Sequence, residues 1–116
     1  MKRETIQRVA SPTAILVGIP EPLATLCTES LQDGGLKVLK AGHVAAACER
    51  LPVMMPQLVV TLDDLRPEEQ EMLKDRCVAV GAETMAISLK QDQRALTVQL
   101  KDAANMALIR ALRRGG

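Results

Sequence analysis

Residues 14–22 read Ala-Ile-Leu-Val-Gly-Ile-Pro-Glu-Pro, an apolar run that ends in a turn. Short continuous apolar runs are typical of strands that are buried on both faces of a parallel sheet. Pro22 suits the first turn of a helix. Core-facing positions of that helix follow at helical spacing as Leu23, Leu26, Cys27, Ser30 and Leu31. The stretch therefore predicts a buried strand, a tight turn and a helix that ends at Gly34-Gly35.

The same alternation of strand and helix signals recurs along the chain. Further strands are expected over residues 37–40, 58–62 and 84–89, and the β-branched run at 58–62 is the clearest of them. Helices are expected over residues 43–51, stopping before Pro52, and from Pro67 to Gly81. Four strand signals that alternate with helices predict right-handed βαβ units, with helices on both faces of a parallel sheet.

The last part of the chain allows two interpretations. Apolar residues recur there at helical spacing as Leu96, Leu100, Ala103, Ala104, Ala107, Leu108, Ala111 and Leu112. Periodicity alone favours one helix from about Asp92 to Arg114. The competing interpretation divides the segment into a helix over residues 92–103 and a strand over residues 106–110.

Two of these stretches resemble a known family. Residues 14–22 resemble the first strand and turn of bacterial response-regulator receiver domains, whose common form is I-L-V-V-D-D-E-P. Residues 101–112 look like the family's E-A-G-A-D-D-Y-L-V-K-P-F. The gap from Ser88 to Arg110 also suits the family's gap between the Thr and Lys that end its fourth and fifth strands. The resemblance covers about residues 13–112.

The resemblance implies an α/β fold of the flavodoxin-like (CheY-like) type. Its doubly wound parallel sheet has five strands in the order 2-1-3-4-5, so the resemblance favours a strand over residues 106–110. The closing fifth helix, which in receivers lies on the same face as the first helix, would be missing or truncated, and that face would be partly bare. One unbroken helix in place of the last strand would count against this interpretation.

The chain length favours one domain, with a lead-in over residues 1–12, a receiver-like domain over residues 13–112 and a tail or linker over residues 113–116. Fifteen basic and 14 acidic side chains nearly cancel, and the aromatic content is 0%. We therefore expect no nucleic-acid partner and no membrane partner. The absence of a signal-peptide pattern favours a cytoplasmic protein.

Cysteines and the single histidine do not form a metal-binding pattern. Cys27, Cys48 and Cys77 are widely spaced among apolar neighbours, and His43 lies in another part of the chain. We expect the three thiols to be buried as small apolar side chains. No metal site and no cofactor is predicted.

In receivers, an acid pair after the first strand and an aspartate after the third hold a divalent cation, and that aspartate accepts the phosphoryl group. Here Ile19 and Pro20 stand at the positions of the acid pair. Phosphoryl transfer to an aspartate needs a cation that neutralises developing charge, and neither residue can bind one. Glu21 matches the family's Glu beside the pair and suits the start of a helix.

The acceptor position can be aligned in two ways. Counting forward from Pro56 places it on Leu62, whereas counting back from Pro67 places it on Asp63. A shift of one residue moves a side chain to the other face of a strand, so the alternatives differ physically. With Leu62 there is no acceptor, and with Asp63 there is an acceptor without its metal partners. Asp64 follows at the same strand end.

The remaining family positions are partly kept. Ser88 keeps the hydroxyl that ends the fourth strand, and Arg110 keeps a positive charge where the family has Lys. Arg110 would pair with Asp63 or Asp64 and replace the cation by an internal ion pair. Ala107 stands at the position of the switch aromatic, and a methyl group has no rotamer to change.

The expected function is that of a non-phosphorylatable pseudo-receiver, without enzymatic activity and without catalytic residues. It would act as a protein–protein interaction module in bacterial signal transduction, with a kinase, an output domain or a second copy as partner, and a homodimer is possible. Candidate interface residues are Gln91, Arg94, Gln99 and Lys101. The alternatives are an atypical phosphoacceptor that uses Asp63 and a flavodoxin-like small-ligand binder.

Overall fold

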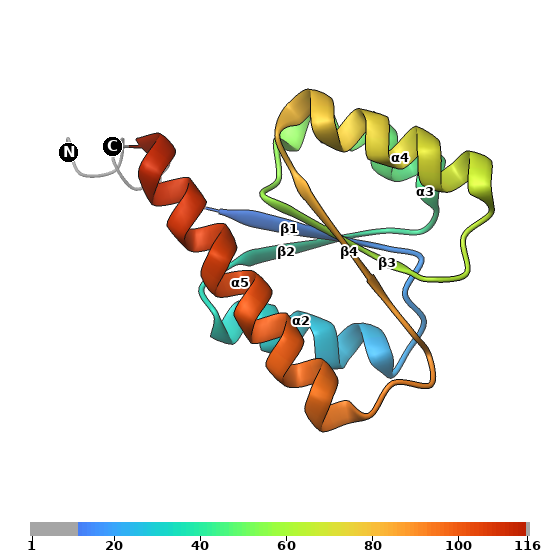
Figure 1. Ribbon diagram of the computed structural model, residues 1–116, viewed down its shortest axis with the longest axis vertical. Coiled ribbons are helices and arrows are strands. Elements are labelled where there is room, and N and C mark those ends of the chain that lie inside the picture. The colour runs from blue at the N-terminus through green and yellow to red at the C-terminus, as the bar shows by residue number, and fades with distance from the viewer. Residues whose placement is uncertain (1–11, 116) are drawn as a thin grey trace.

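The structure is a computed structural model that describes residues 12–115. Four parallel strands form one sheet in the order β2-β1-β3-β4, and four helices pack on it (Figure 1). The elements in chain order are β1 (Thr13–Val17), α2 (Leu23–Asp33), β2 (Lys37–Ala41), α3 (Val44–Met54), β3 (Leu58–Leu62), α4 (Pro67–Val80), β4 (Glu83–Ile87) and α5 (Gln93–Gly115).

The helices cover both faces of the sheet. Helices α2 and α5 lie on one face, and α3 and α4 lie on the other (Figure 1). Along β1, Ala14 and Leu16 pack toward α2 and α5, whereas Ile15 and Val17 pack toward α3 and α4. Each of these side chains is at most 1% exposed. The apolar run that opens the sequence is therefore buried on both faces, as predicted.

The doubly wound parallel sheet and the order of its first four strands are confirmed, but the fifth strand is not formed. Residues 106–110 lie inside α5, so the prediction of a strand there is wrong. Helical packing explains the outcome, because Leu96, Leu100, Ala104 and Ala107 form one fully buried stripe along α5. Alanine is also the strongest helix former and a poor strand former.

Helix α5 packs against α2 on the face that was expected to be partly bare. In the described residues, one helix follows β4 after a short loop, where the resemblance predicted a fifth strand. Strand β4 keeps little cover, since only Ile87 in it is buried. The helix continues to Gly115, so residues 113–115, within the expected tail or linker, are helical. Most of the expected lead-in, residues 1–11, lies outside the described residues.

Two boundaries differ from the sequence interpretation. Helix α3 runs past Pro52 to Met54, where the sequence predicted a stop at Leu51. Pro52 lies in the last turn, so its missing N–H removes only one hydrogen bond near the helix end. Strand β4 begins at Glu83 and ends at Ile87, so Ser88 follows the strand. Helix α4 begins at Pro67 and is capped by Gly81 at φ 76°, as predicted.

Candidate functional site at the carboxyl edge of the sheet

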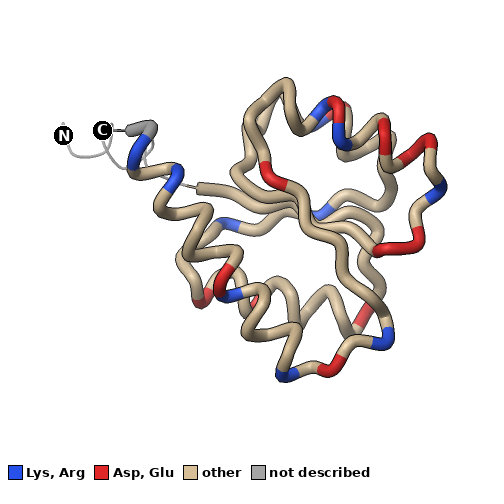
Figure 2. Tube along the Cα trace, in the orientation of Figure 1, with Lys and Arg blue, Asp and Glu red and all other residues tan. Residues whose placement is uncertain are grey.

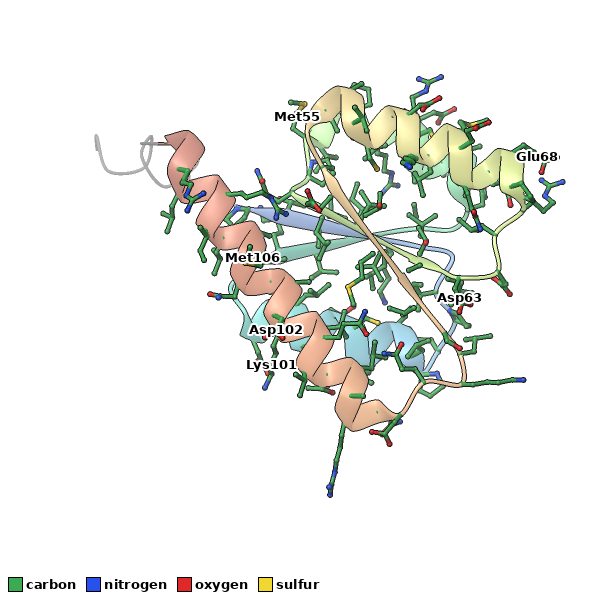
Figure 3. All side chains as sticks on the ribbon, viewed as in Figure 1. Met55, Asp63, Glu68, Lys101, Asp102 and Met106 are labelled. Atoms are coloured by element: carbon green, nitrogen blue, oxygen red, sulfur yellow. The ribbon has the colours of Figure 1, made fainter. Side chains whose placement is uncertain are left out.

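The candidate site lies where the parallel strands end. Because all four strands run the same way, the segments after β1, β3 and β4 meet at one edge of the sheet. The backbone N–H of Asp63 donates to the carbonyl of Ile87 at 2.9 Å, which joins the ends of β3 and β4. Figure 3 labels Asp63 at this edge.

Ile19 and Pro20, at the positions of the family's acid pair, have structural roles. Ile19 is partly buried and packs against the apolar cluster between the sheet, α2 and α5. The carbonyl of Pro20 accepts a hydrogen bond from the N–H of Ala24 at 2.9 Å, which extends the first turn of α2. Neither side chain carries an oxygen or nitrogen atom that binds a cation.

Glu21 caps the first turn of α2. Its Oε1 accepts hydrogen bonds from the hydroxyl of Thr25 at 2.6 Å and from the N–H of Thr25 at 3.2 Å. Its Oε2 lies 3.5 Å from Nζ of Lys40, at the end of β2. The hydrogen bond from Thr25, and then the charge of Lys40, lower the pKa of this carboxyl group. Glu21 is therefore engaged at a helix start, as its position in the sequence suggested.

The two candidate acceptor positions have different surroundings. Leu62 is the last residue of β3, pairs with Ile87 and packs partly against the cluster under α2 and α5. Asp63 and Asp64 form the turn after β3 and are exposed. The first carboxylate after β3 thus belongs to Asp63, which lies in the turn and not in the strand.

Ser88 directly follows β4 and takes part in a local turn. Its Oγ accepts a hydrogen bond from the N–H of Lys90 at 3.1 Å. Its carbonyl accepts from the N–H of Gln91 at 3.2 Å. Ser88 lies one residue beyond Ile87, whose carbonyl holds Asp63, so the hydroxyl and the carboxylate end neighbouring strands.

Arg110 and Ala107 do not lie at the positions that the receiver pattern assigned to them. Nη2 of Arg110 donates to the carbonyl of Gln57 at 3.2 Å, just before β3 begins. Asp63 follows the other end of β3, roughly 20 Å from Gln57 at about 3.3 Å per residue, so the predicted ion pair with Asp63 or Asp64 is wrong. Ala107 is fully buried in α5 and faces the core.

The candidate interface residues lie in the loop before α5 and along α5, where Arg94 and Lys101 are seven positions apart and so lie on one face of the helix. Gln91 and Gln99 are joined by a hydrogen bond between their side-chain amides. Arg94 lines a shallow groove with Leu26 of α2. Lys101 is exposed two positions after Gln99, and residues two apart in a helix point in different directions.

Within residues 12–115, no three His, Cys, Asp or Glu side chains gather closely enough to hold a metal ion. The cysteines Cys27, Cys48 and Cys77 are free and buried, and burial raises the pKa of Cys27 and of Cys77 to about 11. Nδ1 of His43 accepts a hydrogen bond from the N–H of Ala46 and caps α3. The described helices include none with the length and hydropathy to cross a membrane.

Sequence reasoning missed two features of this part of the molecule. Lys40 joins Glu21 across the edge of the sheet, and the position of Lys40 at the end of the second strand is the signal that pointed to this pair. The open side of β4 was hidden by the expectation of a fifth strand. Its signal was the short stretch Thr84-Met85-Ala86, which has no charged residue.

Comparisons with known proteins agree with this fold. No family model matches the sequence, and no curated protein matches it. Among solved structures, the signal receiver domain of a Luxo repressor protein from Vibrio parahaemolyticus is similar, with a TM-score of 0.58 and 16% sequence identity. The match covers 91% of this chain and 99% of that chain. A likeness at this identity shows that the chain has a receiver-like flavodoxin fold.

Proposed function

We propose that this chain is a pseudo-receiver that works in signal transduction by binding another protein, without accepting a phosphoryl group. The receiver-like fold supports a signalling role, since folds of this kind serve as the input modules of such pathways. The observation that carries the proposal is the role of the two residues at the acid-pair positions after β1. Ile19 packs into the core and Pro20 completes a helix turn, so that edge supplies no oxygen ligand from the positions of the acid pair.

Phosphoryl transfer in receivers requires a bound divalent cation, and the residues at the carboxyl edge of this sheet do not form a site for one. Glu21 is already bound to Thr25 and Lys40, and Arg110 lies at the opposite edge of the sheet. Asp63 is then an exposed carboxylate beside Asp64, and among the described residues no third His, Cys, Asp or Glu side chain joins them to hold an ion. An unassisted carboxylate in water is a poor acceptor, because charge develops on the transferred group without compensation.

Incubation with Mg²⁺ and acetyl phosphate, followed by intact mass measurement, tests the proposal. We expect no phosphoryl adduct on the natural chain. A stable adduct that is lost in Asp63→Asn would overturn the proposal in favour of the phosphoacceptor. The matched control is the double variant Ile19→Asp/Pro20→Asp, which we expect to gain Mg²⁺ binding because it restores two carboxylates to the edge. A thermal-shift increase with nucleotides or flavins would instead favour the small-ligand binder.

A further inference from the structure

Strand β4 is an edge strand that carries four open backbone groups. In a parallel strand, the N–H and C=O groups of alternate residues point to opposite sides. The N–H of Glu83 donates to Gln57, and the carbonyl of Ile87 accepts from Asp63, so the odd-numbered residues face β3. The N–H and C=O groups of Thr84 and Ala86 therefore point to the side where the described chain has no further strand.

This edge lacks the features that keep an edge strand from pairing. Natural proteins protect such edges with charged residues, proline or bulges. Thr84, Met85 and Ala86 are neither charged nor proline, and β4 pairs with β3 in an unbroken register. The edge is closed only at its carboxyl end, where the backbone of Ser88 bonds to Gln91.

The segment after β4 cannot fill the edge. Only residues 88–92 separate β4 from α5, and α5 then occupies the chain up to Gly115. A parallel fifth strand would need a crossover of about a dozen residues before it. Within the described residues, the groups on Thr84 and Ala86 thus have no strand to pair with and are open to a strand of another molecule.

We propose that a second copy of this chain pairs with β4, antiparallel to it and related by a two-fold axis. In this register Thr84 of one copy faces Ala86 of the other, so each pair exchanges two hydrogen bonds and all four open groups of each copy are used. Met85 then faces Met85 of the other copy on the axis. The edge is complementary to itself because its open residues are two apart, which is the spacing of an antiparallel ladder.

The side chains beside β4 suit this arrangement. On the α5 side, Met85 lines a groove with Met106, which is 53% exposed, so pairing would bring two methionines from each copy together. Methionine adapts its shape well to such contacts. On the α4 side, Thr84 and Ala86 are small and line a second groove with Leu73. The α5 face of the new ladder would therefore gain apolar cover, and the small side chains on the α4 face leave room for the second copy.

Charge also favours the antiparallel copy. Glu83 begins β4 and Lys90 follows its end, and Figure 2 shows no charge along the strand between them. Antiparallel pairing brings the acidic end of one copy toward the basic end of the other. The net charge of +1 adds little repulsion between two copies.

This inference names a partner for the proposed binding module and so rests on that proposed function. Its test is the variant Met85→Cys, exposed to mild oxidation and examined on a non-reducing gel. Facing residues of a non-hydrogen-bonded pair have Cα atoms about 4.5 Å apart, which a disulfide can span. We expect Met85→Cys to form several-fold more covalent dimer than Ala86→Cys, whose thiol faces Thr84 of the other copy.

Sedimentation equilibrium gives a second, independent measurement. The natural chain should show a dimer whose population rises with concentration, and Ala86→Pro should be monomeric, because proline removes an N–H that only the partner uses. A natural chain that remains monomeric, together with a Met85→Cys variant that links no better than Ala86→Cys, would overturn the proposal and favour a strand from a different protein. The mass measurement of phosphoryl transfer to Asp63 tests the proposed function. Its outcome does not depend on whether the chain forms this dimer.

Discussion

The guanidinium group of Arg110 is bonded to the backbone carbonyl of Gln57, at 3.2 Å, and joins the last helix to the start of the central strand β3. Nε of Arg110 and Oε1 of Gln57 are also buried, and neither has a hydrogen-bond partner among the described residues. Arg110, aligned with the lysine that ends the family's fifth strand, thus binds at the other edge of the sheet. Its replacement should affect stability and leave the carboxyl edge unchanged.

Arg110→Ala is expected to lower the free energy of unfolding by about 1–2 kcal/mol, because a charge-assisted hydrogen bond to a partly buried carbonyl is lost. Urea denaturation would measure the loss. Arg113→Ala is the matched control, since Arg113 lies on the same helix and is exposed. Equal losses in the two variants would show that the bond to Gln57 contributes nothing specific.

Gly34 and Ala104 should be coupled, because they meet where α2 and α5 pack. A Cβ atom on Gly34 would lie 2.5 Å from the Cβ of Ala104, which is closer than two non-bonded carbon atoms can approach. We expect Gly34→Ala to destabilise the protein by about 1–3 kcal/mol through overpacking. The double variant Gly34→Ala/Ala104→Gly should recover part of that loss, as a thermodynamic cycle would show.

A control for this pair is Gly42→Ala, because nothing lies within 4 Å of a Cβ atom at Gly42. That variant should change the free energy of unfolding by less than about 0.5 kcal/mol, as is usual for surface positions. If Gly34→Ala were as mild as Gly42→Ala, α5 would not lie against the end of α2.

Ala107→Phe places an aromatic side chain where the receiver pattern has one, and it should destabilise the protein. Ala107 is fully buried, so a larger side chain would force its neighbours apart at a cost of about 1–3 kcal/mol. Met106→Phe is the matched control, because Met106 is exposed on the same helix. Thermal unfolding of both variants would measure the difference. A stable Ala107→Phe protein would favour the strand that the sequence interpretation placed over residues 106–110.

Buried thiols should make the protein less stable at high pH. Burial raises the pKa of Cys27 and of Cys77 from 9.0 to about 11. Below pH 9 both thiols are protonated in the folded and in the unfolded protein, so they do not lower the free energy of unfolding. Above pH 9 the unfolded chain loses the thiol protons before the folded protein does. The free energy of unfolding therefore falls as the pH rises toward 11. The fall is on the order of 2 kcal/mol for each thiol.

Urea denaturation at a series of pH values from 8 upward would follow this fall. Cys27→Ala should show a shallower decline than the natural chain, whatever its stability at pH 8. A decline of the same steepness in both proteins would assign the effect to other groups.

The sequence alone predicted most of the sheet correctly, but it did not predict the structure of the last part of the chain. Buried parallel strands leave continuous apolar runs, and prolines and glycines mark the helix ends, so β1, β3 and α4 were predicted closely. Residues 92–114 carried a helical period throughout. The family pattern, which has a strand there, outweighed that period and gave the wrong result.

The wrong prediction of a fifth strand also led to wrong positions for two residues of the candidate site. The positions before β4 depend on strands that the sequence identified, since Ile19 and Glu21 follow β1 and Asp63 follows β3. Arg110 and Ala107 were placed through the fifth strand and therefore failed together. Hydrogen bonds such as that between Glu21 and Lys40 depend on how β2 lies beside β1, and a strand order alone does not determine them.

The contact of Gly34 with Ala104 is followed one helical turn later by that of Gly35 with Leu108, whose Cδ1 would lie 3.1 Å from a Cβ atom at Gly35. Sliding α5 by one turn, about 5.4 Å, would bring Leu100 or Leu108 to the place that admits only Ala104. These two close contacts therefore oppose a slide of α5 along its axis past α2. A displacement transmitted to α5 would therefore tilt the helix and would not slide it along its axis.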